Sequence, residues 1–224
     1  MLHGRITEVK KELVQFATLA ETMIERSIRG LLDQNEAILR QIIDEDEPNA
    51  NIFEINIEEL CTSIIAQHEP RARDLRIVLM IYKMTSDIER MADHAVNIAD
   101  SGLFLIKKPL VKPLLDIPRM AEETVKSVGD AIKSFIDEDA QLARNVCERD
   151  DIIDSLEAQI FRELVTFMVS DSSTIERSLF LLRIANNLER VADLATNIAE
   201  DVIFMVQGKV IKHHVDERVV GHVS

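Results

Sequence analysis

The chain has 224 residues, of which 46% are hydrophobic and 4% aromatic, and its formal net charge is −14 at pH 7. An acidic surface repels phosphate backbones, so this composition argues against nucleic-acid binding and favours cations or basic partner surfaces. No apolar run approaches the roughly 18 residues of a membrane span, and Cys61 and Cys147 are too few for a disulfide framework. A cytoplasmic protein with reduced thiols is expected.

Apolar residues recur at intervals of three and four along most of the chain, which indicates amphipathic helices. In the first half, helices are predicted over residues 6–32, 51–67 and 71–106. A short helical stretch over residues 37–43 is expected to end where Pro48 interrupts it, because proline cannot continue a helix.

The second half repeats this organisation after a linker that contains three prolines between residues 107 and 118. Asp116 is expected to be the N-cap of the helix that follows, and Gly208 fits a helix C-terminus. The three helices of this half are predicted over residues 116–135, 150–169 and 175–206.

A duplicated motif relates the two halves. Residues 87–100 read Asp-Ile-Glu-Arg-Met-Ala-Asp-His-Ala-Val-Asn-Ile-Ala-Asp, and residues 187–200 read Asn-Leu-Glu-Arg-Val-Ala-Asp-Leu-Ala-Thr-Asn-Ile-Ala-Glu. The offset of one hundred residues also holds upstream, where Glu54 matches Asp154. The expected fold is all-α, with two tandem three-helix bundles related by an internal repeat. The expected boundaries are 1–106 for the first bundle, 107–116 for the linker, 117–208 for the second bundle and 209–224 for a polar tail.

Each copy of the motif separates its acids from its apolar residues. At about 100° per residue, the acids and the shared asparagine fall on one stripe, opposite the apolar face. The stripe contains Glu89, Asp93, Asn97 and Asp100 in the first copy, and Glu189, Asp193, Asn197 and Glu200 in the second. Solvation explains polar residues in general, but it does not explain these residue types at the same positions twice.

A second pair of carboxylates, Glu54 and Glu58, lies four residues apart on the helix expected beside Glu89 and Asp93. Four adjacent acids repel one another and stay partly protonated without a cation. Oxygen ligands suit iron, manganese, magnesium or calcium, so these acids are a candidate metal site. In the alternative interpretation, the acids pair with arginines such as Arg90 and bind no metal.

The two motifs resemble the duplicated signature of the PhoU family. Residues 70–76, Pro-Arg-Ala-Arg-Asp-Leu-Arg, and residues 208–213, Gly-Lys-Val-Ile-Lys-His, are also similar to that family. The resemblance spans about residues 5–214 and implies two three-helix bundles. It also implies a cytoplasmic negative regulator of phosphate uptake and phosphate-starvation signalling, which couples the ATPase subunit of a phosphate ABC transporter to a sensor histidine kinase. Membrane association would then be peripheral and through these partners, and a homodimer is compatible with the doubled bundle.

The resemblance also implies metal sites, because some family members bind iron or zinc clusters through paired acidic motifs. Carried over to this chain, the first bundle keeps Glu54, Glu58, Glu89 and Asp93. The second keeps Asp154, Glu189 and Asp193. Ala158 stands where a fourth acid is expected, and Asp150 or Asp151 one turn upstream could replace it. Iron or zinc is the expected metal, with other divalent ions left open.

Enzymatic activity is not expected, because the sequence contains no nucleophile–base pair, phosphate-cradling glycine loop or nucleotide fingerprint. Two alternatives remain. One is a carboxylate-bridged metal enzyme. The chain lacks the Glu-x-x-His motif of ferritin-like di-iron sites, which argues against this alternative. The other is a metal-free helical adaptor.

Overall fold

The computed structural model describes residues 2–208, so the predicted polar tail and the part of the Gly208–His213 motif beyond Gly208 lie outside the described residues. Within this part, every regular element is a helix. The long helices are α1 (Leu2–Leu32), α3 (Glu47–His68), α4 (Arg73–Leu105), α5 (Asp116–Asp137), α6 (Ala140–Ser170) and α7 (Ile175–Gln207). The short elements are α2 (Glu36–Gln41), a π-helical turn η1 (Ile42–Asp46) and a 3-10 turn η2 (Ser172–Thr174).

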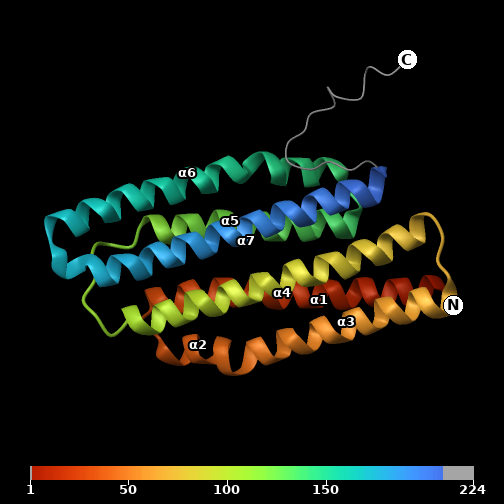
Figure 1. The fold of residues 1–224 in the computed structure, drawn as a ribbon, viewed down its shortest axis with the longest axis horizontal. Coiled ribbons are helices and arrows are strands. Elements are labelled where there is room, and N and C mark those ends of the chain that lie inside the picture. The colour runs from red at the N-terminus through yellow and green to blue at the C-terminus, as the bar shows by residue number, and fades with distance from the viewer. Residues whose placement is uncertain (1, 209–224) are drawn as a thin grey trace, which may run out of the picture.

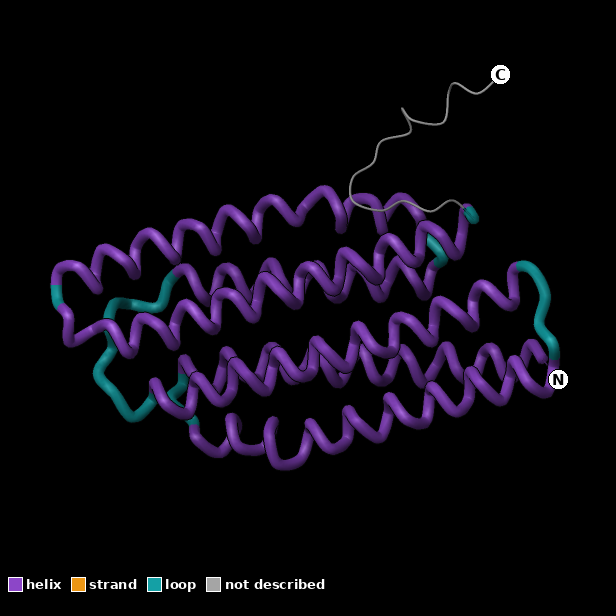
Figure 2. Tube along the Cα trace, viewed as in Figure 1, coloured by secondary structure: helices purple, strands orange, loops and turns teal. Residues whose placement is uncertain are grey.

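The long helices form two bundles that lie side by side. Helices α1, α3 and α4 pack together, as do α5, α6 and α7. Helices α4 and α7 meet along the middle of the molecule, with α3 and α6 at its opposite edges (Figure 1). The connections lie at the two ends of the bundles (Figure 2). The predicted tandem of three-helix bundles is confirmed.

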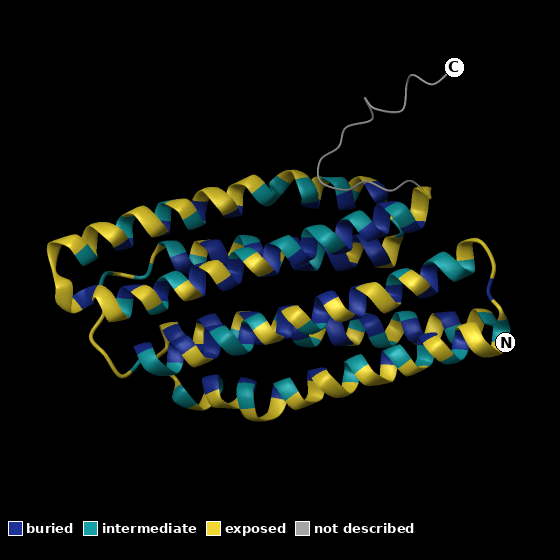
Figure 3. Cartoon of the chain, viewed as in Figure 1, coloured by how far each residue is buried: buried dark blue, intermediate teal, exposed yellow. Residues whose placement is uncertain are grey.

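The core lies where the apolar stripes of the long helices meet. Figure 3 shows dark buried residues along the inner helices and exposed residues along the outer sides of α3 and α6. Ala92, Ala95 and Ala99 of the first motif are buried, as are Ala192, Ala195 and Ala199 of the second. The alanines of the repeated motif therefore face the core, and its acids are free to face outward.

Three local expectations are corrected by the structure. Pro48 does not interrupt the chain with a loop, because it lies in the first turn of α3, where its missing N–H costs nothing, and η1 leads directly into that helix. Helix α6 begins ten residues before the expected position of 150, since Asp139 caps it by accepting from the backbone N–H groups of Gln141 and Leu142. Asp116 is the first residue of α5 and not its N-cap.

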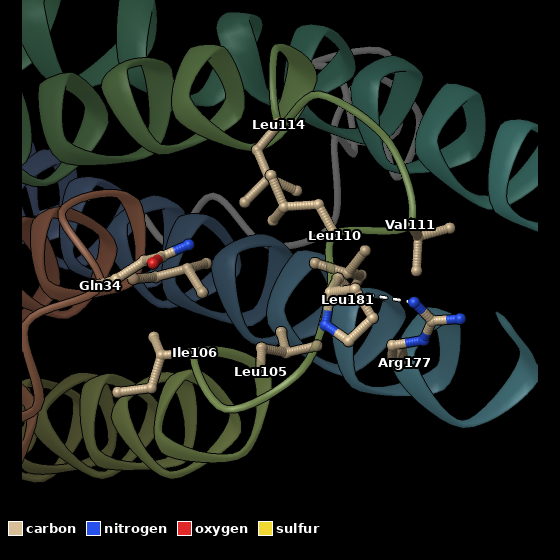
Figure 4. Close-up of a pocket in the computed structure, with 10 residues that line it drawn as sticks. Gln34, Leu105, Ile106, Leu110, Val111, Leu114, Arg177 and Leu181 are labelled. Carbon is tan, nitrogen blue, oxygen red and sulfur yellow. Dashed lines mark hydrogen bonds between the residues drawn. The ribbon is translucent and has the colours of Figure 1, made fainter.

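The linker between α4 and α5 is fixed to the second bundle. Lys112 is only 9% exposed, and its ammonium donates to Asp116 at 2.7 Å and also to Glu163 on α6. Arg177 Nη1 on α7 donates to the carbonyl of Pro109 at 2.8 Å (Figure 4). Leu105, Leu110 and Leu181 line the apolar cavity beneath the linker (Figure 4). Its volume of about 20 Å³ is roughly the space of a single water molecule, so the cavity is a feature of packing.

Candidate functional site

The structure brings the four predicted acids of the first repeat together on one side of α3 and α4. We call this surface the α3–α4 groove; it contains Glu54 and Glu58 on α3 and Glu89 and Asp93 on α4. Burial raises the pKa of Glu89 to about 7, and the charges of Asp93 and Glu54 add to the effect. Burial also raises the pKa of Glu54, with contributions from Glu58 and Asp93. These mutual effects place the four carboxyl groups in one electrostatic cluster.

Sequence reasoning missed two members of this cluster. Glu47, in the first turn of α3, adds to the rise in the pKa of Glu89. Tyr82 lies beside Glu58, whose negative charge is the main reason why the pKa of the phenol is raised. Tyr82 precedes Glu89 by seven residues, which is two helical turns, so helical spacing could have identified it.

The second repeat carries the corresponding surface, the α6–α7 groove, around Asp154, Glu189 and Asp193. Burial raises the pKa of Glu189 to about 7, and Asp193, Glu157 and Asp154 add to the effect while Arg190 opposes it. The pKa of Asp193 is raised by burial and by Asp154, again against Arg190. The structure thus brings together the three predicted acids of this repeat.

The fourth acid of the α6–α7 groove is Glu157, which the sequence analysis did not consider. Glu157 lies one residue before Ala158, and its counterpart in the first repeat is the buried Ile57. Asp150, one of the two expected substitutes, lies beside Cys147, whose pKa it helps to raise after burial and Glu200. Glu157, one residue from the expected position on α6, thus acts on Glu189 as a fourth acid of this groove.

The arginine of the repeated motif behaves differently in the two repeats. Arg190 Nε lies 3.5 Å from Glu189 Oε2, and Arg190 Nη1 lies 3.4 Å from Asp193 Oδ2. Arg90 instead lies 3.8 Å from Asp87, which is outside the predicted set of acids. The acids of the α6–α7 groove therefore have a closer internal counter-charge than those of the α3–α4 groove.

The donor atoms of both grooves are carboxylate oxygens, which suit hard cations. Among residues 2–208, however, no group of three or more His, Cys, Asp or Glu side chains lies in a position to hold one metal ion. The chemistry of the acids fits a cation, but these side chains would have to draw closer together to coordinate it.

Part of the repeated motif joins the two bundles and does not belong to either groove. Asn97 accepts a hydrogen bond from Arg183 Nη2 on α7 at 2.8 Å, although sequence spacing grouped it with the acids. Lys83 Nζ on α4 donates to Asp201 Oδ1 on α7 at 2.5 Å. Helices α4 and α7 thus present the acids of the two grooves outward and other polar side chains, Asp201 among them, to each other.

Comparisons with known proteins agree on one family. The model of the PhoU domain matches the chain twice, over residues 13–102 and 117–202, and each match contains one acidic groove. The Phosphate-specific transport system accessory protein PhoU homolog of Aquifex aeolicus is 37% identical over 218 residues, which are 97% of this chain and 98% of that protein. The Phosphate-specific transport system accessory protein PhoU of Escherichia coli is 27% identical over 211 residues, which are 94% and 87% of the two chains.

Solved structures show the same architecture. The crystal structure of PhoU from Pseudomonas aeruginosa matches with a TM-score of 0.90 and 30% identity, covering 93% of this chain and all (100%) of that one. The PhoU structure from Streptococcus pneumoniae matches with a TM-score of 0.88 at 23% identity, which bears on the fold alone. No helix in the described part of the chain is long and apolar enough to cross a bilayer.

Proposed function

Because the chain belongs to the PhoU family, we propose that it is a negative regulator of phosphate uptake and of phosphate-starvation signalling. It acts as an accessory protein of a phosphate ABC transporter, through the ATPase subunit, and couples that transporter to a sensor histidine kinase. The observation that carries the proposal is the match of both repeats over nearly the full length of named accessory proteins.

The acidic surface supports a role in binding rather than in catalysis. The net charge is −14, and each repeat gathers four or more carboxyl groups in one groove. A helical bundle of this kind holds its surface residues at fixed spacing, which suits recognition of a partner. Basic surfaces of the transporter ATPase or the kinase are the electrostatic complement of these grooves.

Metal binding is the second part of the proposal. Glu54, Glu58, Glu89 and Asp93 would hold iron, zinc or another divalent ion in the α3–α4 groove, and Asp154, Glu157, Glu189 and Asp193 would do so in the α6–α7 groove. The raised pKa of Glu89 supports this assignment, because it reflects burial and repulsion that a cation would relieve. A bound cation would neutralise the acids and hold the two helices of each groove together.

A metal-free helical adaptor is the second candidate. It is favoured by the absence, within residues 2–208, of three donor side chains already positioned around one ion. Metal analysis of the protein after anaerobic purification separates the candidates. If the chain is a metal-free adaptor, the purified protein should retain no metal after it is incubated with ferrous iron or zinc and the excess is removed.

The regulatory proposal is tested by deleting the gene in its own host and measuring a phosphate-starvation reporter in phosphate-rich medium. We expect the reporter to be switched on in the deletion strain and repressed again when the wild-type protein is restored. The transporter ATPase and the histidine kinase should co-purify with the restored protein from phosphate-replete cells. Normal repression in a strain without any family member would overturn the proposal.

A further inference from the structure

Three of the differences between the two grooves change their apolar surface. Glu58, Cys61 and Tyr82 of the first repeat correspond to Ala158, Phe161 and Leu182 of the second. Cys61 is fully buried, whereas Phe161 is 55% exposed. The second repeat has therefore exchanged an acid and a phenol for apolar side chains, and it presents an aromatic ring to solvent.

These exchanges open a pocket on the α6–α7 groove. Glu157, Ala158, Phe161 and Arg162 from α6 and Leu182 and Asn186 from α7 line a space of about 520 Å³. Val165 and Leu179, one turn further on each helix, are also exposed and extend the apolar surface. A contiguous exposed apolar surface with a polar rim is typical of a site for another molecule.

The other end of the same groove is acidic. Asp154, Glu157, Glu189 and Asp193 influence one another there. Glu189 Oε2 is buried and has no hydrogen-bond partner among residues 2–208; its contact with Arg190 Nε is an ion pair at 3.5 Å. The four acids outnumber the two nearby arginines, Arg162 and Arg190, so the groove keeps a negative charge beside its apolar pocket.

We propose that the α6–α7 groove is the docking site for an amphipathic, basic helix of a partner protein. Apolar side chains of that helix seat against Phe161 and Leu182, and its lysines or arginines pair with the acids around Glu189. This deepens the proposed function, on which it rests, by placing a partner contact on the second repeat.

Helix geometry fits this occupant. From Asp154 to Val165, α6 rises by about 17 Å, which a partner helix covers with about three turns. An amphipathic helix lies in such a groove with apolar anchors three and four residues apart and polar residues at its margins. Basic residues on the partner would relieve the burial and repulsion that raise the pKa of Glu189.

Charge complementarity favours a basic partner over a second copy of the chain. Two copies meeting through this groove would bring the same acids face to face, and the chain carries a net charge of −14. The α3–α4 groove lacks the corresponding pocket residues, because Glu58 and Tyr82 occupy the equivalent positions and Cys61 is buried. Ile65 and Leu79 are exposed as their counterparts Val165 and Leu179 are, but an exposed phenylalanine beside an alanine occurs in the second repeat.

The proposal is tested with the full chain in EDTA, so that metal plays no part. The probe is a fluorescein-labelled 18-residue synthetic helix with leucines on one face and lysines on the other, followed by fluorescence anisotropy. A helix with glutamate in place of lysine and a scrambled leucine–lysine peptide are the peptide controls. The wild-type chain should bind the leucine–lysine helix. It should bind each of the two control peptides roughly tenfold more weakly.

The matched protein variants are Phe161→Ser and Ile136→Ser, because Phe161 and Ile136 are 55% and 54% exposed and Ile136 lies on α5, outside the groove. Phe161→Ser should weaken binding about tenfold and Ile136→Ser less than about twofold, with unchanged melting curves for both. Glu157→Lys should also weaken binding of the basic helix. Equal affinities of the two serine variants, or no binding by the wild type, would overturn the proposal.

Two further outcomes separate the alternatives. Self-association of the wild type in sedimentation, abolished by Phe161→Ser, would overturn the proposal in favour of a second copy as occupant. A wild-type chain that binds no peptide but still restores repression of the phosphate-starvation reporter would overturn this inference alone. Normal repression in a strain without any family member would overturn the regulatory proposal, whether or not the peptide binds.

Discussion

His94 on α4 and Asn187 on α7 join the two bundles, with His94 Nδ1 2.8 Å from Asn187 Oδ1. Asn187 Nδ2 donates to the carbonyl of Arg183 at 2.6 Å, so the amide oxygen is the atom that faces His94 and accepts its hydrogen. His94 therefore serves the contact between α4 and α7 and not the acidic groove. At the equivalent positions of the other repeat stand Leu194 and Asp87, and leucine has no hydrogen-bonding group to offer.

Asp87 yields the first prediction, which concerns pH. Burial raises its pKa to about 6, and the negative charge of Asp201 adds to this rise. The positive charges of Lys83 and Arg90 oppose it. Its Oδ2 atom is buried without a hydrogen-bond partner in the described part of the chain. In the unfolded chain Asp87 would titrate near pH 4. The folded protein therefore binds more protons between about pH 4 and 6, and stability falls as the pH rises through that window.

Asp87→Asn removes this charge, so the variant should melt at a higher temperature than the wild type at pH 7.5. The difference should shrink as the pH is lowered to 4, where the wild-type carboxyl is protonated. Melting curves by circular dichroism at several pH values measure the effect. The control is Asp100→Asn, an exposed acid on the same helix, which should stay within about 0.5 kcal/mol of the wild type. A lower melting temperature for Asp87→Asn at pH 7.5 would mean that attraction to Lys83 outweighs burial.

The fold was largely predictable because two independent signals agree. Helical periodicity identified the long helices, and the constant offset of one hundred residues showed that the three-helix unit occurs twice. The errors lie where local chemistry is ambiguous. Residues 140–149 contain several charged side chains that obscure the apolar period, although Asp139 is an ordinary cap for them. Pro48 marks a helix start as readily as a helix end.

The candidate site was predictable where the acids repeat or follow helical spacing, as Glu54 and Glu58 do. Glu89 and Glu189 were found because both copies of the motif contain them, and they carry similarly raised pKa values of about 7. Glu157 has no acidic counterpart at Ile57, so comparison of the repeats could not identify it. The contact of Asn97 with Arg183 was also out of reach, because it depends on how the two bundles pack against each other.

The second prediction concerns the linker. Lys112→Met should destabilise the protein by about 1–3 kcal/mol, because Lys112 is almost fully buried and its loss leaves Asp116 and Glu163 without their shared cation. Lys108→Met is the matched control in the same linker. Lys108 is 45% exposed and lies 3.9 Å from Glu176, so its loss should cost less than about 1 kcal/mol. Urea unfolding measures both, and equal effects would show that Lys112 does not fix the linker.

The third prediction concerns the close approach of α1 to α2. A Cβ atom added at Gly30 would lie 2.7 Å from Leu39 Cδ2 and 2.8 Å from its Cγ. Leu39 is fully buried, so it cannot move aside freely, and Gly30→Ala should destabilise the protein by about 1–3 kcal/mol. Gly4→Ala is the control on the same helix, because nothing described lies within 4 Å of its added Cβ. That variant should match the wild type or be up to about 1 kcal/mol more stable in thermal melts, because alanine favours a helix more than glycine does. An unchanged melting temperature for Gly30→Ala would show that α2 shifts without cost.

The last prediction ranks the two acidic grooves as metal sites. Glu157 gives the α6–α7 groove a fourth acid, whereas Glu47 gives the α3–α4 groove a fifth. The arginines also distinguish the repeats, because Arg190 lies 3.5 Å from Glu189 and 3.4 Å from Asp193, whereas Arg90 lies 3.8 Å from Asp87. A cation entering the α6–α7 groove must displace Arg190 from its contacts with Glu189 and Asp193. A cation entering the α3–α4 groove meets no such contact, because Arg90 acts on Glu89 only through its charge. Affinity for an oxygen site rises with its negative charge, so the first groove should bind metal more tightly.

The ranking is measured as metal content by plasma spectrometry after anaerobic purification and loading with ferrous iron or zinc. Glu89→Ala with Asp93→Ala should remove more metal than Glu189→Ala with Asp193→Ala. Arg190→Gln should raise the metal retained by the second groove, since it removes the competing cation, while Arg183→Gln, which alters an arginine bonded to Asn97 outside the groove, should not. Equal losses of metal from the two double variants would show that displacing Arg190 does not weaken metal binding in the second groove. A wild-type protein that retains no metal after loading would leave both grooves as surfaces for basic partners.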